Sequence, residues 1–96
     1  MAASKAIKLG QHLKELRIHL CQKSTGSKGV RDFLEQHYVS LKQNNPKFPV
    51  LVRECSGVQP MIWARYDRGR EVSVPVAEKS SEQVLSTIEM LAQKSA

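Results

Sequence analysis

Apolar residues alternate with polar ones in short stretches of the chain, most clearly from Leu16 to Cys21, and recur every three to four positions in two longer stretches. Alternation is typical of a half-buried β-strand, whereas the longer period indicates an amphipathic helix. In chain order, the pattern predicts a strand over 16–21, a helix over 29–43, strands over 49–55, 61–66 and 71–76, and a helix from 80 onward. This β-α-β-β-β-α order predicts an α/β fold.

Capping and turn residues mark the ends of these elements. Ser27 is placed to cap the first helix, and Asn45 ends it because a residue that precedes a proline disfavours helical geometry. The segment 67–70 is expected to form the turn of a hairpin between the third and fourth strands. Ser80 and Gln83 match a capping box, in which each side chain bonds the backbone N–H of the other residue.

The order of the elements predicts the topology of the sheet. The first strand, the first helix and the second strand form a right-handed crossover, which makes the two strands parallel neighbours. The hairpin and the last helix then give a mixed four-stranded sheet of order 2-1-3-4, the thioredoxin-like arrangement, with both helices on one face. Pro49 and Pro75 fall in the two edge strands of this order, where a residue that cannot donate to the ladder is tolerated.

The other face of this sheet is predicted to lack a helix, because only residues 56–60 join the second and third strands. The side chains expected on it are Arg17, His19, Cys21, Leu51, Arg53, Cys55, Met61, Trp63, Arg65, Glu71 and Ser73. A bare face of this kind is often merely solvated. A Trp and a Met among arginines are instead enriched in protein interfaces. This composition favours a partner-binding face formed by Arg17, His19, Arg53, Trp63 and Arg65.

Composition narrows the class of protein further. The 96 residues, 41% hydrophobic and 25% charged, suit one small globular domain. No apolar run is long enough to span a membrane, and no P-loop, zinc-protease or nucleophile-elbow motif occurs. The net charge is +6, and residues 1–14 hold three lysines and no acid. We expect a flexible basic segment over 1–13, either a targeting sequence or a solvated terminus, before a thioredoxin-like domain over 14–96.

The two cysteines, Cys21 and Cys55, follow neighbouring parallel strands and are expected on the same face. Adjacent strands lie about 4.8 Å apart, which permits a disulfide. Two reduced thiols are the equally open alternative. A thioredoxin-type oxidoreductase is disfavoured, because the second cysteine of a C-x-x-C motif would fall at Ser24.

Proline and histidine give weaker signals. Pro60 precedes the third strand, where thioredoxin-like proteins commonly hold a cis-proline, and both a cis and a trans bond are open. His19 and His37 are not spaced with acids or cysteines as metal ligands would be. The residues therefore predict no catalytic, cofactor-binding or metal-binding site.

Three segments carry a resemblance to a known family: LRIHLCQ at 16–22, RECSGVQP at 53–60 and WARY at 63–66. In this order they resemble the thioredoxin-like accessory subunits of mitochondrial respiratory complex I, the NADH:ubiquinone oxidoreductase. The resemblance covers about residues 13–94, and the same domain family includes mitochondrial ribosomal proteins. Cys21 and Cys55 match the family's cysteine pair.

The resemblance implies a non-catalytic accessory subunit without a cofactor, peripheral on the matrix side of the mitochondrial inner membrane. The partners it implies are other matrix-arm subunits, above all the largest iron–sulfur subunit. Two alternatives stay open, a mitochondrial ribosomal protein of the same domain family and a thiol–disulfide redox protein. RNA binding is less expected, because base stacking favours exposed aromatic side chains and only 5% of the residues are aromatic.

Overall fold

A computed structural model describes residues 8–9 and 12–93, so most of the predicted basic segment lies outside the described residues. The elements in chain order are β1 (Leu13–Leu20), a short 3-10 helix (Thr25–Ser27), α1 (Lys28–Asn44), β2 (Val50–Glu54), β3 (Met61–Tyr66), a second 3-10 helix (Asp67–Gly69), β4 (Glu71–Pro75) and α2 (Ser81–Gln93). The predicted α/β class and the β-α-β-β-β-α order are confirmed.

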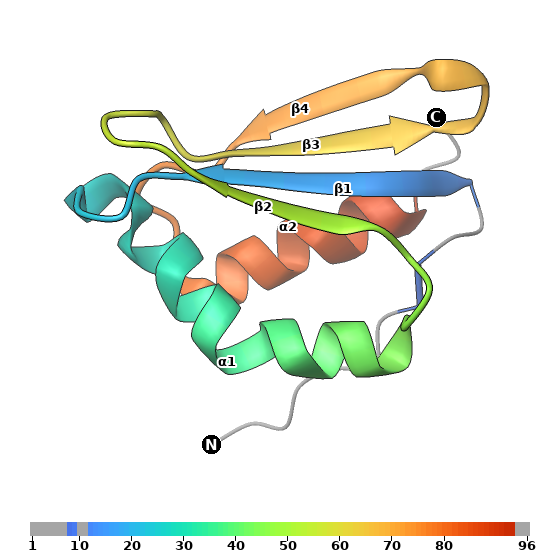
Figure 1. Ribbon diagram of the computed structural model, residues 1–96, viewed down its shortest axis with the longest axis horizontal. Coiled ribbons are helices and arrows are strands. Elements are labelled where there is room, and N and C mark those ends of the chain that lie inside the picture. The colour runs from blue at the N-terminus through green and yellow to red at the C-terminus, as the bar shows by residue number, and fades with distance from the viewer. Residues whose placement is uncertain (1–7, 10–11, 94–96) are drawn as a thin grey trace.

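The four strands form one mixed sheet of order β2-β1-β3-β4, as predicted. β1 is parallel to β2 and antiparallel to β3, which is antiparallel to β4. Both helices lie on the same side of this sheet (Figure 1). Pro75 lies in edge strand β4, and Pro49 immediately precedes edge strand β2. Among the described residues, no helix combines the length and apolar character needed to cross a bilayer.

The hydrophobic core lies between the sheet and the two helices. It is formed by the side chains of β1 and β3 that point toward the helices and by the apolar side chains of α1 and α2 that face the sheet. Its most deeply buried members include Leu16, Ile18, Leu20, Ile62, Phe33, Val84, Ile88 and Leu91, each with no exposed surface. Tyr66 closes one end of the core, where its hydroxyl donates to the Leu91 carbonyl at 2.7 Å. The helices thus cover one sheet face and leave the other open.

β1 begins at Leu13, three residues before the start that alternation predicts. Leu13 and Leu16 are both fully buried although their odd spacing would place them on opposite faces of a regular strand. An irregularity in the pairing with β3 between Leu13 and Glu15 accounts for this, because an inserted residue reverses the direction of the side chains that precede it. Leu13 therefore belongs to the sheet, and Glu15 joins the open face.

The capping box at α2 is confirmed, and Ser27 is the N-cap residue of α1 as predicted, but without a side-chain capping bond. Ser80 Oγ accepts the Gln83 N–H at 3.2 Å, and Gln83 Oε1 accepts the Ser80 N–H at 2.9 Å. Ser27 does precede α1, but its hydroxyl makes no capping bond to the helix. That hydroxyl instead accepts the backbone N–H of Cys21 at 3.0 Å, so it ties the end of β1 to the start of α1.

Candidate functional site

The helix-free side of the sheet, here called the open face, gathers the side chains that the sequence predicts for a partner-binding surface. Strand register arranges them in rows across the sheet. One row runs Leu51–Arg17–Trp63–Ser73, the next runs Arg53–His19–Met61, and a third runs Glu15–Arg65–Glu71. Arg17, His19, Arg53, Trp63 and Arg65 thus lie together in neighbouring rows.

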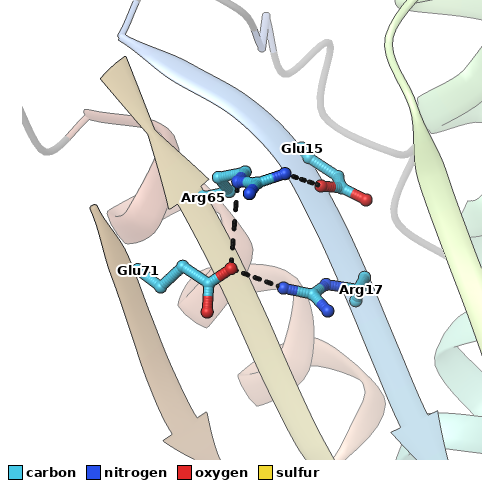
Figure 2. Close-up of polar contacts among 4 residues, drawn as sticks. All are labelled: Glu15, Arg17, Arg65 and Glu71. Carbon is cyan, nitrogen blue, oxygen red and sulfur yellow. Dashed lines mark hydrogen bonds and ion pairs between the residues drawn. The ribbon is translucent and has the colours of Figure 1, made fainter. Parts of the chain in front are cut away.

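A network of ion pairs lies at one end of the open face (Figure 2). Arg17 Nη2 lies 2.7 Å from Glu71 Oε2, and the same oxygen lies 3.8 Å from Arg65 Nε. Arg65 Nη1 lies 3.6 Å from Glu15 Oε1. Two guanidinium groups therefore meet two carboxylates, and their charges balance locally. The face is less basic than the sequence suggests, because acids from β1 and β4 neutralise the arginines of β1 and β3.

Trp63 lies at the centre of the open face, between two side chains from β1. The Arg17 guanidinium carbon is 6.0 Å from the Trp63 ring centroid, within the range of a cation–π contact. The His19 and Trp63 ring centroids are 6.4 Å apart and tilted by 43°. Because Glu71 also binds Arg17, the guanidinium is fixed beside the ring. Trp63 is half-buried, and its ring is oriented by these contacts within the chain.

His19 contributes little positive charge to the face at neutral pH. Burial lowers the pKa of the imidazole below its ordinary value, and the nearby charges of Arg17 and Arg53 lower it further. Arg53 itself is exposed and has no ion-pair partner among the described residues. Of the three arginines predicted for this surface, Arg53 is the one whose charge is available to another molecule.

A groove crosses the open face over β1 and β2 and has a volume of about 470 Å³. The residues that line it are Glu15, Arg17, His19, Leu51, Arg53, Cys55 and Val58. Their mixture of apolar and charged side chains suits a protein side chain better than a metal ion. Among the described residues, no three His, Cys, Asp or Glu side chains come together as metal ligands would.

The two cysteines are free thiols in different surroundings, so the disulfide left open by the sequence is not formed. Cys55 is exposed and lines the groove. Cys21 is buried, and its Sγ accepts the Gly57 N–H at 3.3 Å. Backbone N–H groups of Lys23, Gly57 and Ser24 lower the pKa of Cys21 to about 7, because they stabilise the thiolate. Cys21 follows β1, which ends at Leu20, so strand alternation does not set the direction of its side chain.

The Gln59–Pro60 peptide bond is trans, so the cis-proline considered from the sequence is absent. Trans is the preferred isomer of most X–Pro bonds by about 0.5–1 kcal/mol. Pro60 nevertheless takes part in the sheet, because its carbonyl accepts the Val76 N–H at 3.1 Å. Pro60 thereby extends the pairing of β3 with the end of β4.

Sequence reasoning missed two residues that line the groove of the open face, Glu15 and Val58. The predicted strand begins at Leu16, so Glu15 is not among the residues expected on the sheet. The signal that could have identified Glu15 is the pair Leu13 and Leu16. These two apolar residues are three positions apart, which in a regular strand would place them on opposite faces. Such a break beside an alternating run is typical of a β-bulge.

Known proteins share both the domain and most of the length of this chain. Residues 30–81 match the domain family described as mitochondrial ribosomal protein L51 / S25 / CI-B8. NADH dehydrogenase (ubiquinone) 1 alpha subcomplex subunit 2 of Mus musculus is 52% identical over 83 residues, which are 86% of this chain and 84% of that protein. The protein of the same name from Arabidopsis thaliana is 48% identical over 88 residues, 92% of this chain and 91% of that protein.

A ribosomal relative is more distant. The large ribosomal subunit protein mL43 of Mus musculus is 31% identical over 85 residues. These residues are 88% of this chain but 46% of that protein.

Proposed function

This chain belongs to the mitochondrial ribosomal protein L51 / S25 / CI-B8 domain family, and on that premise we propose that it is an accessory subunit of NADH:ubiquinone oxidoreductase, respiratory complex I. The observation that carries the proposal is 52% identity to an alpha subcomplex subunit 2 protein across more than four fifths of both chains. The likeness to mL43 covers less than half of that ribosomal protein, and this supports the complex I assignment over the ribosomal one.

The proposed role is structural and concerns assembly, without catalysis by this chain. The segment 21–24, Cys-Gln-Lys-Ser, lacks the second cysteine that a thioredoxin-type reaction needs. The family resemblance favours a mitochondrial location, peripheral to the inner membrane on its matrix side. In the same way it favours contact with other matrix-arm subunits, of which the largest iron–sulfur subunit is the proposed neighbour.

The open face is the proposed contact surface, with Trp63 as its anchor. An aromatic side chain that is held in place before binding loses little conformational entropy when a partner covers it. Arg17 and His19 flank the Trp63 ring, and Glu71 fixes Arg17. This support from neighbouring side chains is what distinguishes Trp63 from a solvated surface aromatic.

Native capture of the tagged chain from mitochondria tests the proposed function. We expect complex I subunits to be the dominant companions by mass spectrometry and the chain to migrate with complex I on a native gel. Treatment with ribonuclease before capture is the matched control, since it should leave these companions unchanged. Recovery of mitochondrial ribosomal proteins in place of complex I subunits would show that the assignment is wrong.

A further inference from the structure

β2 is an edge strand, and its outer edge carries backbone groups that no other strand binds. In the sheet order β2-β1-β3-β4, the strand over Val50–Glu54 pairs with β1 alone. The Leu16 N–H donates to the Pro49 carbonyl at 3.1 Å, and the Cys55 N–H donates to the Leu20 carbonyl at 3.0 Å. In a parallel ladder every second residue bonds the same neighbour, so residues 49, 51, 53 and 55 face β1. The N–H and carbonyl groups of Val52 and Glu54 therefore point outward.

This edge lacks the proline or β-bulge that protects many edge strands, although Arg53 and Glu54 place charges on it. β4, the opposite edge, contains Pro75, whose ring removes a backbone donor, whereas no proline or bulge interrupts β2. The side chains of Leu51 and Val52 are 49% and 38% exposed. They are two of the four exposed large hydrophobic residues in the described part of the chain, and they lie next to each other on opposite faces of one strand. An added strand would cover both.

The charge beside this edge indicates what kind of segment fits. Arg53 is exposed on the open face and lacks an ion-pair partner among the described residues, whereas Arg17 and Arg65 are already bound by acids. The groove that Arg53 lines runs along β2. A second copy of this chain carries the same net charge of +6, so overall charge repulsion opposes its approach to this edge. An acidic segment of a different protein fits the edge better.

We propose that β2 accepts an extended segment of a neighbouring complex I subunit as a fifth strand, with an acidic side chain beside Arg53 and apolar side chains over Leu51 and Val52. This proposal rests on the proposed function, because the neighbour is a subunit of that complex. Backbone hydrogen bonds from Val52 and Glu54 would supply the binding, and the side chains of the segment would supply its specificity. The open face around Trp63 would then continue the same interface onto the sheet.

Hydrogen exchange tests the proposal directly, because it compares outward with inward amides of one strand. In the isolated chain, the amides of Val52 and Glu54 should exchange fast, whereas those of Leu51 and Arg53 are protected by β1. In native complex I that contains the chain, we expect the two outward amides to exchange at least tenfold more slowly. Presence of the chain in complex I with unchanged exchange at Val52 and Glu54 would overturn the added strand alone. Absence of the chain from complex I would overturn the proposed function and this proposal together.

A pair of variants separates the backbone from the side chain of Val52. Val52→Pro removes the outward N–H and leaves the inward ladder intact, because Val52 does not bond β1. Val52→Thr keeps the N–H and the branched shape. In competition with the wild-type chain for incorporation into complex I, we expect about a tenfold disadvantage for Val52→Pro and less than about threefold for Val52→Thr. Equal incorporation of Val52→Pro and wild type would contradict the proposal.

Arg53→Glu provides an independent variant that leaves every backbone group in place. Reversing this exposed charge should lower incorporation about tenfold if an acidic side chain lies beside it, and the effect should weaken as the salt concentration rises. Arg68→Glu, in the exposed turn between β3 and β4, makes the same change of net charge away from the edge and should incorporate like the wild type. Equal loss in both variants would mean that net charge alone matters, and this would overturn the acidic segment.

Discussion

Replacing Trp63 with alanine removes the proposed anchor of the open face. Trp63 is half-buried between Arg17 and His19, and its ring is oriented by contacts within the chain. If a partner protein covers the open face, the side chain becomes fully buried on assembly. If the face is merely solvated, the same substitution changes only the stability of the isolated chain. The two cases predict different results in the assembled complex.

The expected loss of binding follows from the surface that Trp63 still exposes. A buried aromatic side chain covers about 150–250 Å², and contacts within the chain already hide much of it. About 50 Å² left for the partner corresponds to roughly 1 kcal/mol at about 25 cal/mol per Å². The partner surface that packs against the ring contributes a similar amount, which brings the total to about 2 kcal/mol. This free energy corresponds to about thirtyfold weaker binding.

Competition between two tagged chains in the same cells measures this difference. Wild type and variant carry different tags, and mass spectrometry gives their ratio in native complex I. We expect Trp63→Ala to be depleted about thirtyfold and Trp63→Phe to keep most of its incorporation, since phenylalanine retains an aromatic ring. Arg68→Ala, in the exposed turn, should incorporate like the wild type because a solvated charge outside the interface contributes little.

Circular dichroism and thermal melting of each isolated variant separate docking from folding. Truncation also removes the contacts within the chain that hide much of the ring, which costs the isolated chain about 2–4 kcal/mol at about 25 cal/mol per Å², so its melting temperature should fall by roughly 10–20 °C. Ser73→Lys is a second variant of the same surface, because Ser73 is exposed and pairs with Trp63 across β3 and β4. It adds an unpaired charge beside the anchor with little effect on the fold. Full incorporation of both Trp63→Ala and Ser73→Lys would refute docking through the open face.

Two further predictions concern the fold and the thiol. A Cβ at Gly29 would lie 1.6 Å from the Lys79 carbonyl oxygen, so Gly29→Ala should lower the free energy of unfolding by about 3 kcal/mol in a denaturant titration. Gly26→Ala is the control, because open space surrounds its new methyl group, and equal destabilisation of the two variants would contradict the steric argument. The pKa of Cys21 is lowered from 9.0 to about 7 by the backbone N–H of Lys23 and two others, so the folded state loses its thiol proton first. In denaturant titrations, the free energy of unfolding of the wild type should therefore rise relative to that of Cys21→Ser between pH 7 and pH 9, and this gain should be lost below pH 7. A difference between the two proteins that does not vary with pH would count against a thiolate at Cys21.

The sequence by itself determined the elements, their order and the arrangement of the sheet. Hydrophobic periodicity depends on neighbours a few positions apart, so β3 over Met61–Tyr66 and the capping box of Ser80 and Gln83 could be found from the residues alone. The handedness of the crossover and the positions of Pro49 and Pro75 then left one sheet order. The sequence also indicated which strand residues share the open face, because successive side chains along a strand point to opposite faces of the sheet.

Only the tertiary structure decided the charge of the open face and the state of the thiols. Glu71 lies 54 positions from Arg17 in the chain, yet strand pairing places their charged atoms 2.7 Å apart. Cys21 lies just beyond the last residue of β1, where a turn and Gly57 set its surroundings instead of strand alternation. Local pattern fixes which face a residue takes inside a strand. Across strands and beyond their ends, the partner of each polar group depends on register and turn geometry, which arise only when the whole chain has folded.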